Sequence, residues 1–213
     1  TIEFMKKIAA LFLLIFNINS NEYVTGSIVD YSGLIKMPNA RFKVEGTTSF
    51  VYSRFEPYGK YVFQFSPFDW FEGSLFYTDI NSLGYPDYER SSGGGQSQKD
   101  KGFTLKTRLI KEGECYGFGF SFCDYLPNIA VGLVDFAGTS LSSSEYVVAS
   151  KSVGRFDFTA GMGWGALGSS DNLGGNPFSA ISEEFNNRGS GYSSGLMGGV
   201  PGVSSWFKGP TSI

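Results

Sequence analysis

Catalysis needs nucleophiles, acids and bases at spacings that bring them together, and this sequence offers few such sets. It contains no histidine, which excludes histidine-based triads, histidine general bases and histidine-ligated zinc sites. Glu183 and Glu184 form an adjacent carboxylate pair, but neighbouring side chains diverge on a helix or a strand, so we interpret them as solvated. We therefore expect a protein that is not an enzyme and that binds no cofactor or metal.

The two cysteines favour structural rather than redox chemistry. Cys115 and Cys123 are too widely spaced for a CxxC redox pair and, without histidine, too few for a zinc site. We predict that they form a local disulfide that contributes about 2–3 kcal/mol. Two free buried thiols are the alternative. The surrounding residues 113–127 are interpreted as an insertion on the periplasmic side of a barrel.

Charged side chains alternate with apolar ones along several segments, and these charges are the candidate binding residues. A lysine or arginine that faces lipid near the midplane costs about 2–4 kcal/mol, so we place the charges inside a barrel. There they either pair across neighbouring strands or contact an anionic or neutral glycan. The predicted lumen-facing charges are Lys106, Arg108, Glu145, Lys151, Arg155 and Asp157.

Strands must position these side chains, because the apolar residues repeat with a period of two and not of 3.6. Most of the expected strands have about the 9–11 residues that a tilted strand needs to cross a bilayer. The expected strands are residues 45–53, 60–66, 70–79, 102–111, 128–136, 143–151 and 154–164. An eighth strand is expected to begin at Ser204.

The two faces of the segment 154–164 differ in side-chain size. We predict that Phe156, Phe158, Met162 and Trp164 face lipid, whereas Arg155, Asp157 and Thr159 face the barrel interior. Asp135 shares its parity with apolar neighbours, so we expect it at a rim or after a bulge.

The composition also favours a β-rich membrane protein. Charged residues make up 17% and aromatic residues 17% of the chain, and there are 29 glycines. A net charge of -3 argues against a nucleic-acid partner. A mean hydropathy of -0.08 excludes a bundle of membrane helices. Few charges and many aromatics favour a β-rich protein whose outer surface need not face water.

The connections between the expected strands alternate in length. Short turns fall at residues 67–69 and 152–153, and long polar connections at residues 80–101 and 165–203. Outer-membrane barrels have short periplasmic turns and long external loops. Within the second long connection, residues 178–185 are expected to form a short helix.

The N-terminus has the pattern of an export signal. Lys6 and Lys7 precede the apolar run 8–16, which is too short to span a bilayer. We predict a signal peptide at residues 5–20, a periplasmic segment at 21–43 and an incomplete outer-membrane barrel domain at 44–213. No cysteine follows the apolar run, so we expect no lipid anchor.

Several separated motifs resemble the YjbH/GfcD family. They are Gly33–Ala40, Leu126–Thr139, Ser143–Lys151, Phe156–Gly165 and Trp206–Pro210. The resemblance implies an outer-membrane β-barrel linked to exopolysaccharide and capsule production. It also implies that the chain is the N-terminal part of a larger protein, with outer-membrane lipid, polysaccharide and other export-machinery proteins as partners.

The sequence thus predicts an all-β fold, an antiparallel transmembrane β-barrel of which about seven to eight strands are present. The expected function is that of a non-enzymatic component of exopolysaccharide or capsule biosynthesis and export, in the outer membrane of a Gram-negative bacterium. A secreted soluble β-sandwich that binds glycans and a general diffusion porin are the alternatives.

Overall fold

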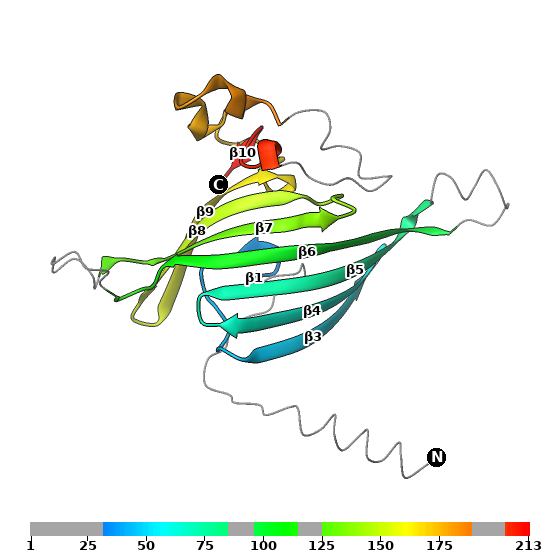
Figure 1. Cartoon of the computed structure of the whole chain (residues 1–213), viewed down its shortest axis with the longest axis horizontal. Helices are drawn as coiled ribbons and strands as arrows, with labels where there is room; N and C mark the ends of the chain where they lie inside the picture. The colour runs from blue at the N-terminus through cyan, green and yellow to red at the C-terminus, as the bar shows by residue number, and fades with distance from the viewer. Residues whose placement is uncertain (1–31, 85–95, 115–124, 189–202) are drawn as a thin grey trace, which may run out of the picture.

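A computed structural model of the chain describes residues 32–84, 96–114, 125–188 and 203–213. The predicted signal peptide at 5–20 and both cysteines lie outside these residues. The described chain is all-β, apart from short 3-10 helices (Figure 1). None of the helices in the described ranges has the length and apolar character of a membrane-spanning helix.

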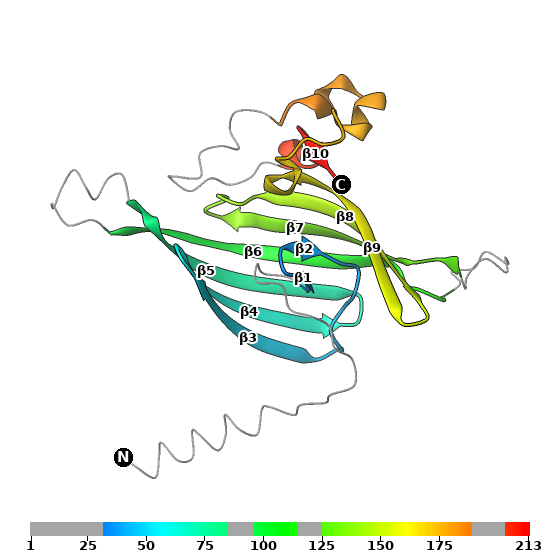
Figure 2. The ribbon, with the colours of Figure 1, turned by 180° about the vertical axis from the view of Figure 1, so that it is seen from behind.

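One antiparallel sheet of eight strands dominates the molecule (Figure 1). The strands follow one another across the sheet in chain order, from β3 at one edge to β10 at the other. They are β3 (Thr47–Phe55), β4 (Tyr58–Phe68), β5 (Phe71–Gly84), β6 (Ser97–Ile110), β7 (Asn128–Gly138), β8 (Ser144–Val153), β9 (Phe156–Gly165) and β10 (Thr211–Ser212). A separate hairpin of β1 (Gly33–Leu34) and β2 (Met37–Pro38) lies across one face of the sheet (Figure 2).

The seven strands expected between residues 45 and 164 are all present, so the period-two pattern is confirmed as the signal for strands. The largest differences from the expected ranges are in β5 and β6. β5 and β6 have 14 residues each, and they extend into the connection expected at 80–101. Polar and charged residues, among them Asn81, Ser82, Gln98 and Asp100, make up much of these extensions and hide the apolar period.

The strand ends separate into two sides. At the end that we call the turn end, short turns join β4 to β5 and β8 to β9, and the chain enters β3. At the opposite end, the loop end, lie the short turns from β3 to β4 and from β7 to β8 and the longer connections from β5 to β6 and from β9 to β10. β6 pairs directly with β7, so residues 111–127 connect two neighbours at the turn end.

The two faces of the sheet are defined by what covers them. The inner face is the one that carries Lys106 and supports the N-terminal segment, residues 32–46, which includes β1 and β2 (Figure 2). The outer face carries the alternate residues, such as Phe103 and Leu105. Strand geometry forces this alternation, because successive side chains point to opposite faces.

Asp135 lies in a bulge of β7. Leu105 pairs with Leu133 and Phe103 with Ala137, so three residues of β7 lie opposite Thr104. Asp135 has a φ of 49°, and this turns its side chain to the inner face. There its carboxylate accepts hydrogen bonds from the amides of Ser140 and Ser142, at 3.2 and 3.0 Å.

A small apolar core lies between the inner face and the N-terminal segment. Ala40 and Phe42 of that segment pack against Ala130, Tyr146 and Val148. Gly132 in β7 makes room for the Tyr146 ring. A Cβ at position 132 would lie 2.2 Å from the Tyr146 Cζ.

Two expectations for the C-terminal part are wrong. Residues Val203–Ser205 form a 3-10 helix, η6, and not the start of a strand. The eighth strand of the sheet is β10, which pairs Thr211 with Trp164. In place of one helix at 178–185, two 3-10 helices are present, η3 (Pro177–Ala180) and η4 (Glu183–Asn186), capped by the side chains of Asn176 and Ser182.

Candidate functional site

The inner face collects polar side chains that are buried. On neighbouring strands, Gln64 pairs with Ser74, and Ser74 pairs with Thr104. All three are at most 5% exposed. Most buried surfaces of soluble domains are apolar, so a buried polar sheet face that lies under the N-terminal segment is the first candidate for a functional surface.

A buried ion pair holds the N-terminal segment on this face. The Nζ of Lys106 lies 3.3 Å from the Glu72 Oε2, and it also donates a hydrogen bond to the Arg41 carbonyl. The other oxygen of Glu72 accepts hydrogen bonds from the Ser32 hydroxyl at 3.0 Å and the Lys43 amide at 2.6 Å. Burial of a charge is costly unless partners satisfy it, and here the partners come from the segment.

The ring of Phe42 lies beneath two cations of β6. The Lys106 Nζ is 4.3 Å and the Arg108 Cζ 4.5 Å from the ring centroid. A cation over the face of an aromatic ring is attracted by the ring quadrupole. The apolar core and the cations of the inner face therefore meet at the same residue of the N-terminal segment.

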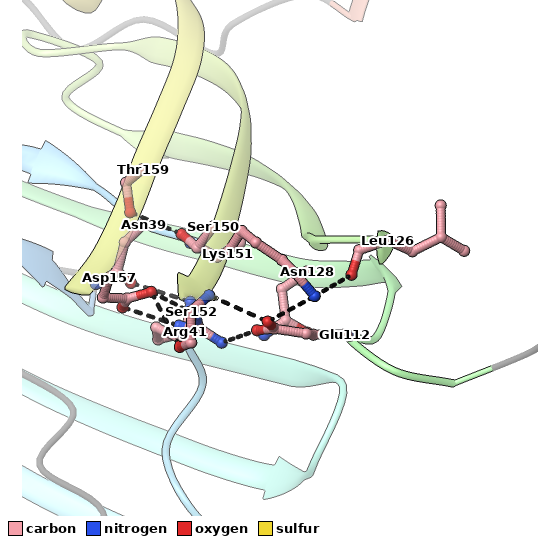
Figure 3. Close-up of polar contacts among 11 residues, drawn as sticks. Asn39, Arg41, Glu112, Leu126, Asn128, Ser150, Lys151, Ser152, Asp157 and Thr159 are labelled. Carbon is pink, nitrogen blue, oxygen red and sulfur yellow. Dashed lines mark hydrogen bonds and ion pairs between the residues drawn. The ribbon is translucent and has the colours of Figure 1, made fainter. Parts of the chain in front are cut away.

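Arg41 links the N-terminal segment to the turn end of the sheet (Figure 3). Its Nε and Nη2 form a bidentate pair with Asp157, at 3.0 and 2.5 Å. Its Nη1 donates to the Glu112 Oε2 at 2.7 Å, and Nη2 also donates to the Ser152 hydroxyl at 2.7 Å. One guanidinium thus joins β8, β9 and the connection that follows β6, which suits the planar fork of arginine.

Glu112 is the second centre of this cluster (Figure 3). Its Oε1 lies 3.1 Å from the Lys151 Nζ and accepts a hydrogen bond from the Ser152 amide at 3.1 Å. Burial acts to raise the pKa of the Glu112 carboxyl, but hydrogen bonds from Arg41, Lys151 and Ser152 lower the pKa below its ordinary value. The carboxylate is therefore held in its charged form by the contacts that it makes.

Smaller side chains complete the attachment. The Ala40 amide donates to the Ser150 hydroxyl at 2.9 Å, and Ser150 shares a 2.8 Å hydrogen bond with Thr159. The Asn128 side chain accepts from the Glu112 amide at 2.9 Å. We refer to Arg41, Glu112, Lys151, Ser152 and Asp157 as the Arg41 cluster.

Three of the six predicted lumen-facing charges lie on the inner face. Lys106 and Arg108 occupy β6 there, and Asp157 occupies β9 and contacts Arg41. Arg155 lies in the tight turn between β8 and β9 and is exposed.

The placement of Glu145 and Lys151 on the inner face is wrong. Glu145 pairs with Trp164 and Lys151 with Phe158, so both belong to the outer face. Alternation along β8 separated them from Tyr146 and Val148 correctly, but the choice of which set faces inward was reversed. Tyr146 and Val148 are the buried inner residues, because they pack against the N-terminal segment.

Glu145 tolerates its position because other residues cover it. Arg188 donates to both of its carboxylate oxygens, at 2.7 and 2.8 Å, and the Phe207 amide donates at 3.0 Å. The Glu145 side chain is 1% exposed. A fully paired, desolvated carboxylate of this kind is structural.

The prediction that Trp164 faces lipid is also wrong, because this side chain is buried. Its side chain is 0% exposed, stacks on Phe178 at 5.4 Å between centroids and meets Phe207 edge-on at 5.2 Å. Phe156 and Phe158, at the other end of the same strand, are 71% and 59% exposed on the outer face. The described C-terminal residues 177–188 and 203–207 thus cover Trp164 and Glu145 on the outer face, near the loop end of β8 and β9, and leave Phe156 and Phe158 uncovered.

Sequence reasoning missed Arg41, Glu72 and Glu112. Glu72 had a weak signal, because it lies within the expected strand 70–79 and shares its parity with Ser74 and Thr78. Arg41 and Glu112 lie outside the strands, where no periodicity indicates a face. The described residues contain no group of three potential metal ligands. The arrangement can hold a chain segment and bind charged or hydroxyl-rich groups.

Comparisons with known proteins add a family. The family model described as "Exopolysaccharide biosynthesis protein YbjH" matches residues 27–213. A relative from Escherichia coli (strain K12), called "Uncharacterized lipoprotein YjbH", is 40% identical over 181 residues. The match covers 85% of this chain and 24% of the relative, so the chain spans about a quarter of that protein's length. No solved structure matches the chain.

Proposed function

The chain belongs to the YjbH family of exopolysaccharide biosynthesis proteins, and from this premise we propose that it forms part of an outer-membrane β-barrel that serves polysaccharide export without catalysing a reaction. One observation carries the proposal. The sheet is inverted relative to that of a soluble protein, with aromatic side chains exposed on the outer face and polar side chains buried on the inner face.

An apolar row across four strands supports contact with lipid. Phe50 pairs with Phe63, Phe63 with Leu75 and Leu75 with Phe103. These side chains are between 39% and 63% exposed. An exposed apolar band of this kind is unfavourable in water, whereas the outer face of a membrane barrel requires it.

Aromatic residues flank this row on both sides, as interfacial girdles do in membrane barrels. Toward the loop end, Tyr52, Tyr61 and Tyr77 pair in the next row, with ring centroids 4.8 and 6.5 Å apart. Toward the turn end, Phe68 and Trp70 are stacked at 5.4 Å and half exposed. Tyrosine and tryptophan favour the membrane–water boundary because their rings are amphipathic.

The topology fits the same proposal. β3 to β9 have 9–14 residues, which is long enough to cross a bilayer at a tilt. The longest connection between strands, from β9 to β10, lies at the loop end, which would be the external side of an outer-membrane barrel, so the turn end would be the periplasmic side. The N-terminal segment enters at the same end, as expected for an exported chain that inserts from the periplasm.

The part of the outer face that we assign to lipid is limited. It comprises β3 to β6 and the turn-end half of β9, because residues in 177–188 and 203–207 cover Trp164 and Glu145. The name of the relative describes a lipoprotein, which supports membrane association of this chain as well. In this proposal, the inner face of the sheet of this chain lines the interior of the barrel, where polysaccharide and export-machinery proteins are the proposed partners.

Cell fractionation tests the location. We expect the protein in the outer-membrane fraction of a Gram-negative host, extracted only by detergent. Recovery in the soluble periplasm or the medium would instead indicate a secreted β-sandwich and contradict the proposal.

A genetic assay tests the role. Deletion of the gene is expected to reduce exopolysaccharide or capsule outside the cell without reducing the uptake of small solutes. Loss of solute uptake with normal polysaccharide would instead indicate a general diffusion porin.

A further inference from the structure

We propose that a cleft on the inner face, at the loop end, binds an acidic sugar unit of a polysaccharide. This inference rests on the proposed function and names the ligand class of the barrel interior. The cleft, which we call the rim cleft, has a volume of about 330 Å³. Known ligand pockets begin at about 300 Å³. The residues that carry the argument are Lys36, Phe55, Tyr58, Lys60, Thr78 and Asp100.

Two separate parts of the chain supply cations to the rim cleft. Lys36 comes from the turn between β1 and β2, and Lys60 comes from β4. Lys60 lies one row of side chains from the Phe55–Tyr58 pair, in register with Thr78 and Asp100. Among the described residues that line the cleft, two lysines and one aspartate carry an excess of positive charge. A ligand with a carboxylate or another acidic substituent suits this balance.

Buried polar groups without partners point to a ligand. Thr78 is 6% exposed, lines the rim cleft, and its Oγ1 has no hydrogen-bond partner among the described residues. Gln98, in the adjacent row, is 0% exposed, and both polar atoms of its side chain lack partners within the same described ranges. Buried polar groups are nearly always hydrogen-bonded, so the Thr78 hydroxyl calls for an occupant of the cleft that donates or accepts a hydrogen bond, whereas Gln98 is not among the residues that line the cleft.

An aromatic pair forms the wall of the rim cleft at its mouth. The rings of Phe55 and Tyr58 lie 5.3 Å apart on the two sides of the turn from β3 to β4. A pyranose ring has an apolar C–H face and a rim of hydroxyl groups. The apolar face suits the two aromatic rings, and the hydroxyls suit the hydroxyl of Thr78 and the carboxylate of Asp100. Lysines, an aromatic wall and an unpartnered hydroxyl together favour an acidic sugar over an apolar ligand.

Calorimetry on the protein in detergent micelles tests this inference, with tetragalacturonate as the acidic probe and maltotetraose as the neutral one. We expect the acidic probe to bind at least about tenfold more tightly, and each of the substitutions Lys60→Met and Thr78→Val to weaken its binding about tenfold. Lys101→Met is the matched control, because Lys101 lies on the outer face of β6, and it should leave binding unchanged.

Thermal unfolding separates a binding role from a structural one. Thr78→Val removes an unpartnered buried hydroxyl and keeps the shape of the side chain, so we expect the unfolding temperature to stay equal or to rise while the affinity falls. A fall in both quantities would mean that Thr78 is structural and would overturn its role in the site.

The remaining outcomes are also decisive. Equal affinity for the two probes, unchanged binding in Lys60→Met, or no binding by a protein that fractionates with the outer membrane would each overturn the inference and leave the proposed function intact. A protein absent from the outer membrane would overturn the proposed function itself.

Discussion

Phe63 and Gln64 are consecutive residues of β4, yet the phenylalanine is 44% exposed and the glutamine 5%. The phenylalanine belongs to the apolar row of the outer face. The glutamine lies under the N-terminal segment, where its side-chain oxygen accepts a hydrogen bond from the Lys43 Nζ. This inversion recurs along the neighbouring strands, and it is the physical basis for assigning lipid to one face and a polar interior to the other.

A charged side chain in the apolar row should destabilise the folded protein. Phe63→Arg is expected to destabilise the folded protein in bilayers by about 2–4 kcal/mol, because the guanidinium would face hydrocarbon. Phe63→Leu, which keeps an apolar side chain, is the control and should cost much less. Urea titration in lipid vesicles measures both. Equal stability of the arginine and leucine variants would contradict a lipid-facing position.

The strands could be predicted from the sequence. When the two faces of a strand meet different surroundings, their side chains differ, and this produces the period of two. Phe156 and Phe158 are exposed on the outer face as predicted. The prediction of which side chains face inward was wrong for β8, where the apolar residues Tyr146 and Val148 face inward. Their burial depends on Phe42 and Ala40, which are more than 85 residues away in the chain, and local alternation contains no such information.

The residues of the candidate site likewise include some that the sequence predicted and some that it did not. Lys106 was found because it lies in a strand with a clear period. Arg41 was not found, because its role depends on three partners from distant parts of the chain, Glu112, Ser152 and Asp157. Trp164 was misplaced because Phe178 and Phe207 pack against it, and nothing in the period of β9 predicts that contact.

The Arg41 cluster should anchor the N-terminal segment. Arg41→Met is expected to weaken that attachment by about 1–2 kcal/mol, a value reduced because the Asp157 side chain is 47% exposed. Hydrogen exchange at the amides of residues 39–43 should accelerate, while exchange in β4 and β5 stays unchanged. Arg54→Met removes an arginine from an exposed pair with Glu56 and is the control. Uniform acceleration over the whole sheet would contradict a local anchor.

Acid should release the same segment. The pKa of Glu112 is lowered in the folded protein from an ordinary value of 4.5, so its contribution is fully present above that value and is lost as the pH falls through the lower, folded-state value. The protection of the amides of residues 39–43, measured against the intrinsic exchange rate at each pH, should therefore fall below about pH 4.5. In Glu112→Gln this step should shrink. An unchanged step in that variant would assign the acid sensitivity to other groups.

Gly132 should be sensitive to a single methyl group. A Cβ there would lie 2.2 Å from the Tyr146 ring, so Gly132→Ala is expected to cost about 1–3 kcal/mol of stability. Gly59→Ala is the matched control, because a Cβ at that position meets nothing within 4 Å. The double variant with Tyr146→Ala should recover part of the loss from Gly132→Ala. Additive losses would mean that the two residues are not in contact.

The central claim, that one face of the sheet meets lipid and the other a polar interior, is tested most directly by spin-label accessibility in bilayers at two adjacent positions of β9. Phe158 lies on the outer face and Thr159 on the inner face. A label at position 158 should be relaxed by oxygen, which concentrates in hydrocarbon, and a label at position 159 by a polar nickel reagent. The reverse pattern, or polar access at both positions, would contradict the membrane-barrel account.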